Sequence, residues 1–150
     1  MKGNDLTHTI SEDMTVFPGS ETQKLTTKST YEKDGFKETL LQMYSHVGTH
    51  MDPPAHIFTN QKTLDQFSPE QFIDKALVVD CRDLKEGQAI TIDKIDIDKA
   101  KLADFLLFNL GWDKRWNLDT YFNDYPCIDN TVLEFILNSN FKGIGFDVMG

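Results

Sequence analysis

The sequence predicts an α/β fold with a mixed sheet, built as a single domain. Strand-like stretches with a hairpin turn occupy the first half, and apolar, β-branched runs alternate with helical stretches in the second. The 150 residues, 39% of them hydrophobic, can bury one core. No repeat, low-complexity tract or Gly/Ser linker marks a boundary, so we expect residues 1–150 to form one domain.

The first half of the chain is expected to form antiparallel strands. Strands are predicted over residues 6–10, 24–30 and 36–44. The turn-like Lys33-Asp34-Gly35 stretch joins the last two as a hairpin. Between the first two strands, Pro18-Gly19 predicts a tight turn that leaves Phe17 on a loop, either as core filler or as the wall of a pocket.

The second half is expected to alternate helices with strands. Residues 68–71 form a good helix start, with serine as N-cap, proline at the first position and glutamine closing a capping box, and a short helix to about Lys75 is expected. A helix over residues 131–137, capped by Asp129 or Asn130, precedes the final strand. Apolar runs typical of strands buried on both faces cover residues 76–80, 105–109 and 143–148. The second run could equally be the end of a helix begun near Asp98.

Composition and charge exclude several classes of function. The formal net charge is −9 and no run of Lys and Arg occurs, so we expect no nucleic-acid partner. The cysteines, Cys81 and Cys127, lie far apart beside apolar residues, which favours two buried, reduced thiols over a disulfide. Neither a signal peptide nor a run of about 20 apolar residues is present, so we expect a cytoplasmic protein without a membrane partner.

Residues 46–56 read HVGTHMDPPAH and contain three of the four histidines. A helical zinc motif is not expected, because a glycine and two prolines interrupt the segment and no glutamate follows the first histidine. In an extended segment, alternate side chains share one face, so we expect a row on one side. The row consists of His46, Gly48, His50 and Asp52, with the glycine leaving space for an ion between the imidazoles.

Two histidines and one carboxylate form a set that binds a divalent metal and leaves positions open for water and substrate. Zn²⁺ is the first expectation, and Mn²⁺ or Fe²⁺ would also suit the set. His56 follows the two prolines and could lie near the metal as a general acid/base, or it could be a surface residue that caps the turn. His8 stands alone and is expected to be structural. Chance proximity is a poorer explanation for the clustered residues.

At these residues the sequence resembles the cyclase-like metal hydrolase family, which includes bacterial kynurenine formamidase and isatin hydrolase. Its signature, HxGTHxDxPxH, is filled at every fixed position of residues 46–56. Residues 10–19, 107–112 and 125–150 are also similar to the family, the last leading to a family aspartate at Asp147. The resemblance covers nearly the whole chain and implies the family's swivelling β/β/α fold.

The resemblance implies roles for individual residues. His46, His50 and Asp52 would bind the first metal, and Asp52 would also bridge to a second. His56 would be the acid/base, and Phe17 would line the substrate pocket. Trp112 could also hold an aromatic substrate, although core packing is favoured for it; for Phe17 the two roles are evenly balanced.

The implied activity is that of a metal-dependent hydrolase of C–N bonds other than peptide bonds, arylformamidase-like, acting on a small amide, formamide or cyclic amide. Metal-bound hydroxide would be the nucleophile. The resemblance also implies a small-molecule substrate and a homo-oligomer, either a dimer or a tetramer.

The family's second metal takes a His and a Glu from a C-terminal segment, and no histidine follows His56 in this chain. We therefore expect a C-terminally incomplete domain with an incomplete second site. The alternative is a non-catalytic metal-binding or interaction protein derived from the family.

Overall fold

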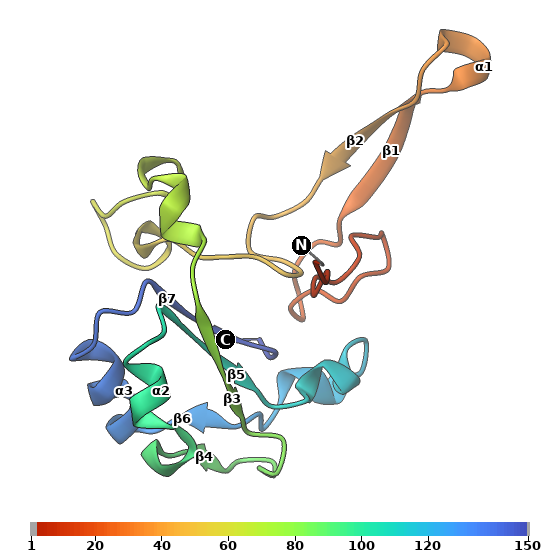
Figure 1. Cartoon of the computed structure of the whole chain (residues 1–150). Coiled ribbons are helices and arrows are strands. Elements are labelled where there is room, and N and C mark those ends of the chain that lie inside the picture. The colour runs from red at the N-terminus through yellow and green to blue at the C-terminus, as the bar shows by residue number, and fades with distance from the viewer. Residues whose placement is uncertain (1–2, 150) are drawn as a thin grey trace. The chain divides into compact units, whose positions relative to one another are not determined.

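An antiparallel hairpin dominates the first part of the chain. In the computed structural model, which describes residues 3–149, β1 (Lys24–Ser29) pairs with β2 (Glu38–Gln42). One helical turn, α1 (Tyr31–Asp34), joins them and ends at Gly35 in the left-handed conformation (φ 77°). The predicted hairpin is confirmed, with a helical turn as its connection (Figure 1).

The other residues before the second unit have little regular structure. The chain divides into two compact units, one up to Leu64 and the other from Asp65 onward. The strand predicted over residues 6–10 is wrong, because this segment pairs with no strand and is irregular. The turn at Pro18-Gly19 is confirmed: the Ser20 N–H donates to the Phe17 carbonyl at 2.9 Å.

A parallel sheet organises the second unit. Its strands are β3 (Ala76–Asp80), β5 (Phe105–Asn109) and β7 (Gly143–Phe146), with β5 in the centre. The three predicted strands are confirmed, and the helical alternative for residues 105–109 is wrong. Parallel neighbours need crossover connections, and α2 (Ile97–Ala100) and α3 (Asn130–Leu137) lie on them.

Short elements complete the connections between these strands and helices. β4 (Ala89–Ile90) pairs in parallel with β6 (Cys127–Ile128). The 3₁₀ turns are η1 (Pro54–His56), η2 (Leu64–Gln66), η3 (Pro69–Phe72), η4 (Ile92–Lys94), η5 (Trp112–Arg115) and η6 (Asp119–Phe122).

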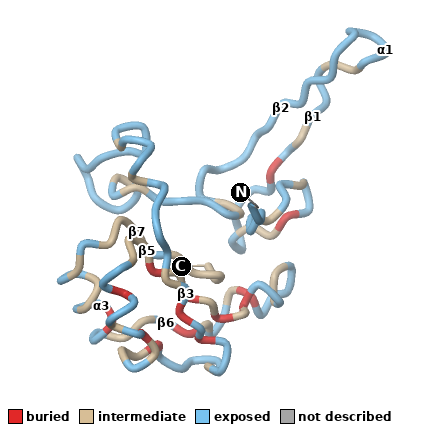
Figure 2. Tube along the Cα trace, in the orientation of Figure 1, coloured by how far each residue is buried: buried red, intermediate tan, exposed pale blue. Residues whose placement is uncertain are grey.

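The core of the second unit lies on one face of its sheet. Leu106 and Phe108 of β5 are buried, and the Phe108 ring stacks on Phe146 with centroids 5.0 Å apart. The sequence predicted that all three strands are buried on both faces. This prediction is wrong, because Val78 in the edge strand β3 is 56% exposed. Figure 2 shows most of the buried segments in this unit.

The helix starts follow the predictions in part. Asp129 caps α3, since its carboxylate accepts a hydrogen bond from the Val132 N–H at 3.0 Å. Ser68 precedes η3 as expected, but its side chain caps no backbone N–H. The helix expected to reach Lys75 is wrong, because the segment forms only a 3₁₀ turn that ends at Phe72. Gln71 donates instead to the Lys142 carbonyl at 3.3 Å, so the predicted capping box is wrong.

The two cysteines differ in environment. Cys81 is buried as expected, whereas Cys127 is exposed, so the prediction of two buried thiols is wrong for the second. β6, which contains Cys127, is only two residues long and leaves that side chain uncovered. Among the residues described, no helix is both long and apolar enough to cross a membrane.

Candidate metal centre

The loop after β2 carries the histidine motif in a bent conformation. Residues 45–49 form successive bends, and Gly48 lies in the left-handed region (φ 67°). The extended segment expected from the alternating pattern is therefore wrong. A Cβ atom at Gly48 would lie 3.0 Å from the Met14 Sδ, so the missing side chain makes room for Met14 rather than for an ion.

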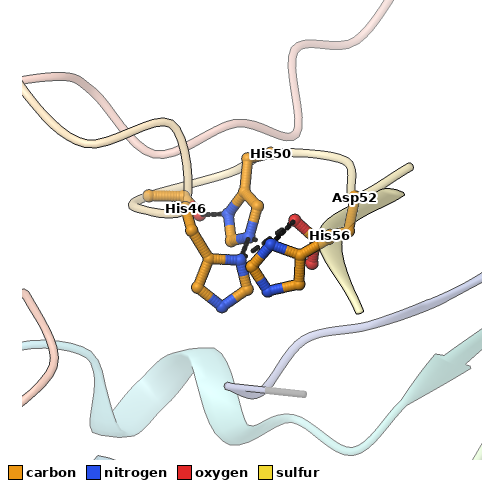
Figure 3. A network of polar contacts seen from close by, with 5 residues as sticks. His46, His50, Asp52 and His56 are labelled. Carbon is orange, nitrogen blue, oxygen red and sulfur yellow. Dashed lines mark hydrogen bonds and ion pairs between the residues drawn. The ribbon is translucent and has the colours of Figure 1, made fainter. Parts of the chain in front are cut away.

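Three predicted ligands nevertheless converge through this bend (Figure 3). His46 Nδ1 lies 3.0 Å from Asp52 Oδ1 and 2.9 Å from His50 Nε2. The ligand atoms of all three lie within 4.8 Å of one another. In a tetrahedral zinc site with bonds of about 2.1 Å, two ligand atoms lie roughly 3.4 Å apart. The residues therefore fit a single divalent ion without large rearrangement.

A backbone carbonyl determines which nitrogen of His50 can bind a metal. His50 Nδ1 lies 2.8 Å from the Gly48 carbonyl oxygen. Because a carbonyl oxygen only accepts hydrogen bonds, Nδ1 carries the proton and Nε2 keeps its lone pair. This is the arrangement in which an outer hydrogen bond orients a metal-binding imidazole.

His56 lies beside the three ligands on η1. Its Nδ1 is 4.0 Å from Asp52 Oδ1, and its ring stacks on that of His46 with centroids 4.4 Å apart. The η1 turn is held by a hydrogen bond from the Ala55 N–H to the Lys62 carbonyl at 3.1 Å. His56 thus belongs to the same polar cluster as the three predicted ligands.

Asp52 supplies the negative charge of the cluster. Partial burial is the largest single influence and raises the pKa of its carboxyl group. The hydrogen bond with His46 and the field of three neighbouring imidazoles together outweigh it, so the pKa is lowered from its ordinary value of 3.8. Asp52 is therefore ionised at neutral pH and ready to bind a cation.

A cleft of about 460 Å³ opens beside these residues. His50, Asp52 and His56 contribute to its wall, together with the apolar side chains of Met51 and Leu64. The cleft thus combines the donor groups with an apolar surface, as small-molecule sites commonly do.

Phe17 lies on the loop before Pro18-Gly19, and 58% of its surface is exposed. It does not line this cleft.

The remaining candidates have structural roles in the second unit. Trp112 is 4% exposed and its Nε1 donates to the Tyr121 carbonyl at 3.0 Å, which confirms core packing. Asp147 accepts hydrogen bonds from the Leu110 and Trp112 N–H groups at 2.7 and 3.1 Å. It therefore ties the end of β7 to the segment that follows β5.

Sequence reasoning missed two contacts made with the motif loop, residues 45–49. Met14 packs against Gly48, and the Thr49 hydroxyl accepts a hydrogen bond from the His8 N–H at 3.0 Å. The available signal was weak: Met14 belongs to the family-like stretch at residues 10–19, and Thr49 is a fixed position of the motif.

Two curated proteins are similar to nearly the whole of this chain. An uncharacterised protein of Methanocaldococcus jannaschii is 29% identical over 143 residues, 95% of this chain and 66% of that protein. A kynurenine formamidase of Geobacillus thermodenitrificans is 24% identical over 96% of this chain and 67% of its own length. The chain thus spans about two thirds of the length of these curated relatives.

Solved structures confirm the predicted α/β, cyclase-like fold. A crystal structure of an isatin hydrolase bound to the product analogue thioisatinate superposes with a TM-score of 0.80 at 20% identity, covering 98% of this chain and 67% of that one. A family model described as "Putative cyclase" matches residues 4–150. With the signature motif, its converging donors and this match over almost its full length, the chain belongs to the cyclase family.

Proposed function

We propose that this protein is a metal-dependent hydrolase that cleaves the C–N bond of a small amide, formamide or cyclic amide, in the manner of an arylformamidase. The convergence of His46, His50 and Asp52 beside His56 carries the proposal. Similarity to a kynurenine formamidase and to an isatin hydrolase supports the hydrolase class.

Each residue of the cluster has a distinct task in this proposal. His46 and His50 would hold a Zn²⁺ or Mn²⁺ ion through ring nitrogens, and Asp52 would offset part of its charge. The ion, when bound, would lower the pKa of a water molecule and act as a Lewis acid toward the scissile carbonyl. His56 takes the proton from the attacking water and donates it to the leaving nitrogen.

The substrate is expected to lie in the cleft against its apolar wall. Met51 and Leu64 offer apolar contacts there, next to the donor groups. Phe17 does not line the cleft. It remains our candidate for stacking on an aromatic substrate because the family resemblance implies this role for it.

Metal binding can be tested without any substrate. Purified chain should bind about one Zn²⁺ or Mn²⁺ in equilibrium dialysis and melt at a higher temperature when the ion is added. His50→Ala should lose both effects, whereas Asp98→Asn, on the surface of the second unit, should keep them. Absence of binding to the wild-type chain would refute the proposed metal centre.

Catalysis needs a separate test with an aryl formamide as substrate. His56→Ala should retain the metal but lower kcat by about 10²–10⁴-fold, as expected for removal of a general acid/base. Phe17→Ala should mainly raise KM for aromatic substrates. Turnover that is unchanged in His56→Ala would show that another group transfers the proton.

A second candidate is a metal-binding or interaction protein without catalytic activity. Among the described residues the structure contains one group of metal donors, His46, His50 and Asp52. A protein that uses this group only to hold an ion would fit the same geometry. Metal-loaded chain that binds one ion tightly but does not hydrolyse aryl formamides would support it.

A further inference from the structure

We propose that residues 8–14 act as a clamp that positions His50 for metal binding, with Met14 and Thr49 as positioning residues. We call residues 8–14 the clamp segment. This inference rests on the proposed metal centre, which it extends from the ligands to the residues that hold them. It concerns contacts within the first unit alone.

The first contact is a hydrogen bond to the residue before His50. The Thr49 hydroxyl oxygen accepts it from the His8 N–H at 3.0 Å. Thr49 stands between Gly48 and His50 in the chain, so this bond restrains the backbone from which the His50 side chain extends.

The second contact is packing against Gly48, the residue whose carbonyl orients His50. Met14 is 4% exposed, and a Cβ atom at Gly48 would meet its Sδ at 3.0 Å and its Cε at 3.3 Å. The Gly48 carbonyl in turn accepts the hydrogen bond from His50 Nδ1. Met14 therefore fills the side-chain position of Gly48, on the residue whose carbonyl orients the His50 ring.

The clamp segment is itself fastened to the hairpin. Gln23, just before β1, is 2% exposed, and its side-chain amide donates to the Met14 carbonyl at 3.0 Å and to the Ser11 carbonyl. The Glu12 carboxylate accepts from the Leu25 N–H of β1 at 2.9 Å. These hydrogen bonds hold the clamp segment, including Met14, against the start of β1.

Such a support matters because the motif loop has no strand partner to hold it. Residues 45–49 are bends, and their side chains are mostly exposed, so the loop itself provides little restraint. Outer-shell groups that orient a ligand typically change metal affinity by about 10–100-fold when removed. We expect the clamp contacts to act at the lower end of this range.

The test compares paired substitutions in the full chain. Met14→Ala and Thr49→Val should each raise the Kd for Zn²⁺, measured by chelator competition, by about 10-fold. Met14→Leu, which keeps the volume, and Thr49→Ser, which keeps the hydroxyl, should stay within about threefold of wild type. Met43→Ala, a partly exposed methionine outside the clamp, serves as the control.

A second readout separates positioning from simple stability. With Co²⁺ as the probe, the visible absorption bands of Thr49→Val should shift relative to wild type, since a displaced His50 changes the ligand field. Wild-type binding with an unchanged Kd and spectrum in Met14→Ala and Thr49→Val would overturn the clamp, even if the metal-free variants melt earlier. Failure of the wild-type chain to bind any ion would instead overturn the proposed metal centre and the clamp with it.

Discussion

At the scale of single residues, Gly48 decides how the motif is arranged. Its positive φ bends the loop, and its missing side chain admits Met14. A residue with a Cβ atom would be strained by the backbone conformation and would also press on the methionine sulfur. The glycine is thus needed for two reasons, neither of which is the space between imidazoles expected from an extended segment.

Gly48→Ala should therefore lower the free energy of unfolding by about 1–3 kcal/mol, from backbone strain and from the contact with Met14. Urea denaturation of the metal-free chain measures it. Gly35→Ala is the matched control, because Gly35 also has a positive φ (77°) but nothing lies within 4 Å of its Cβ position. Gly35→Ala should lower the free energy of unfolding by about 1 kcal/mol. Equal losses in the two variants would argue against the Met14 contact.

At the scale of elements, the start of α3 shows how a single capping residue determines where a helix begins. Asp129 accepts hydrogen bonds from the Val132 N–H and the Thr131 hydroxyl, at 3.0 and 2.7 Å. The hydrogen bond from Thr131, followed by that from the Val132 backbone, lowers the pKa of Asp129. The cap contributes to stability above the ordinary carboxyl pKa and is weakened as pH falls through the lowered folded-state value.

Asp129→Ala should lower the melting temperature by a few degrees near pH 7, because two hydrogen bonds at the start of α3 are lost. Asp129→Asn keeps an acceptor and should lose less. The gap between wild type and Asp129→Ala should narrow when melting is repeated well below the ordinary carboxyl pKa of 3.8. A gap that is constant with pH would show that the charge of the carboxylate plays no part.

At the scale of the whole molecule, burial is very unequal along the chain. In the described part of the first unit only Met14 and Gln23 are buried, whereas the second unit contains the core around Leu106, Phe108 and Val132. The two cysteines also differ in burial. Burial raises the pKa of Cys81 to about 11, while Cys127 is exposed.

Ellman's reagent should therefore release one equivalent quickly from the native chain at pH 8, from Cys127. The second should appear only in denaturant, because the Cys81 thiol is both inaccessible and protonated. Cys127→Ser should abolish the fast phase. Two thiols that react at one rate would show that the second unit opens readily around β3.

Short sequence patterns predicted secondary structure correctly where residues close in the chain determine it. The turn at Pro18-Gly19, the hairpin, the cap at Asp129 and the runs that became β3, β5 and β7 were all recognisable from short stretches. Predictions failed where distant contacts decide. Residues 6–10 look like a strand but find no partner, and Gln71 reaches Lys142 across 71 positions instead of closing a capping box.

By itself, the sequence determined which side chains are candidate metal ligands, since the motif concentrates two imidazoles and a carboxylate on one short segment. Only the tertiary structure decided how they meet. The bend at Gly48 and its packing on Met14, 34 positions earlier, bring the donor atoms within 4.8 Å. An alternating pattern cannot reveal this, because a backbone bend is set by contacts with residues that the pattern does not contain.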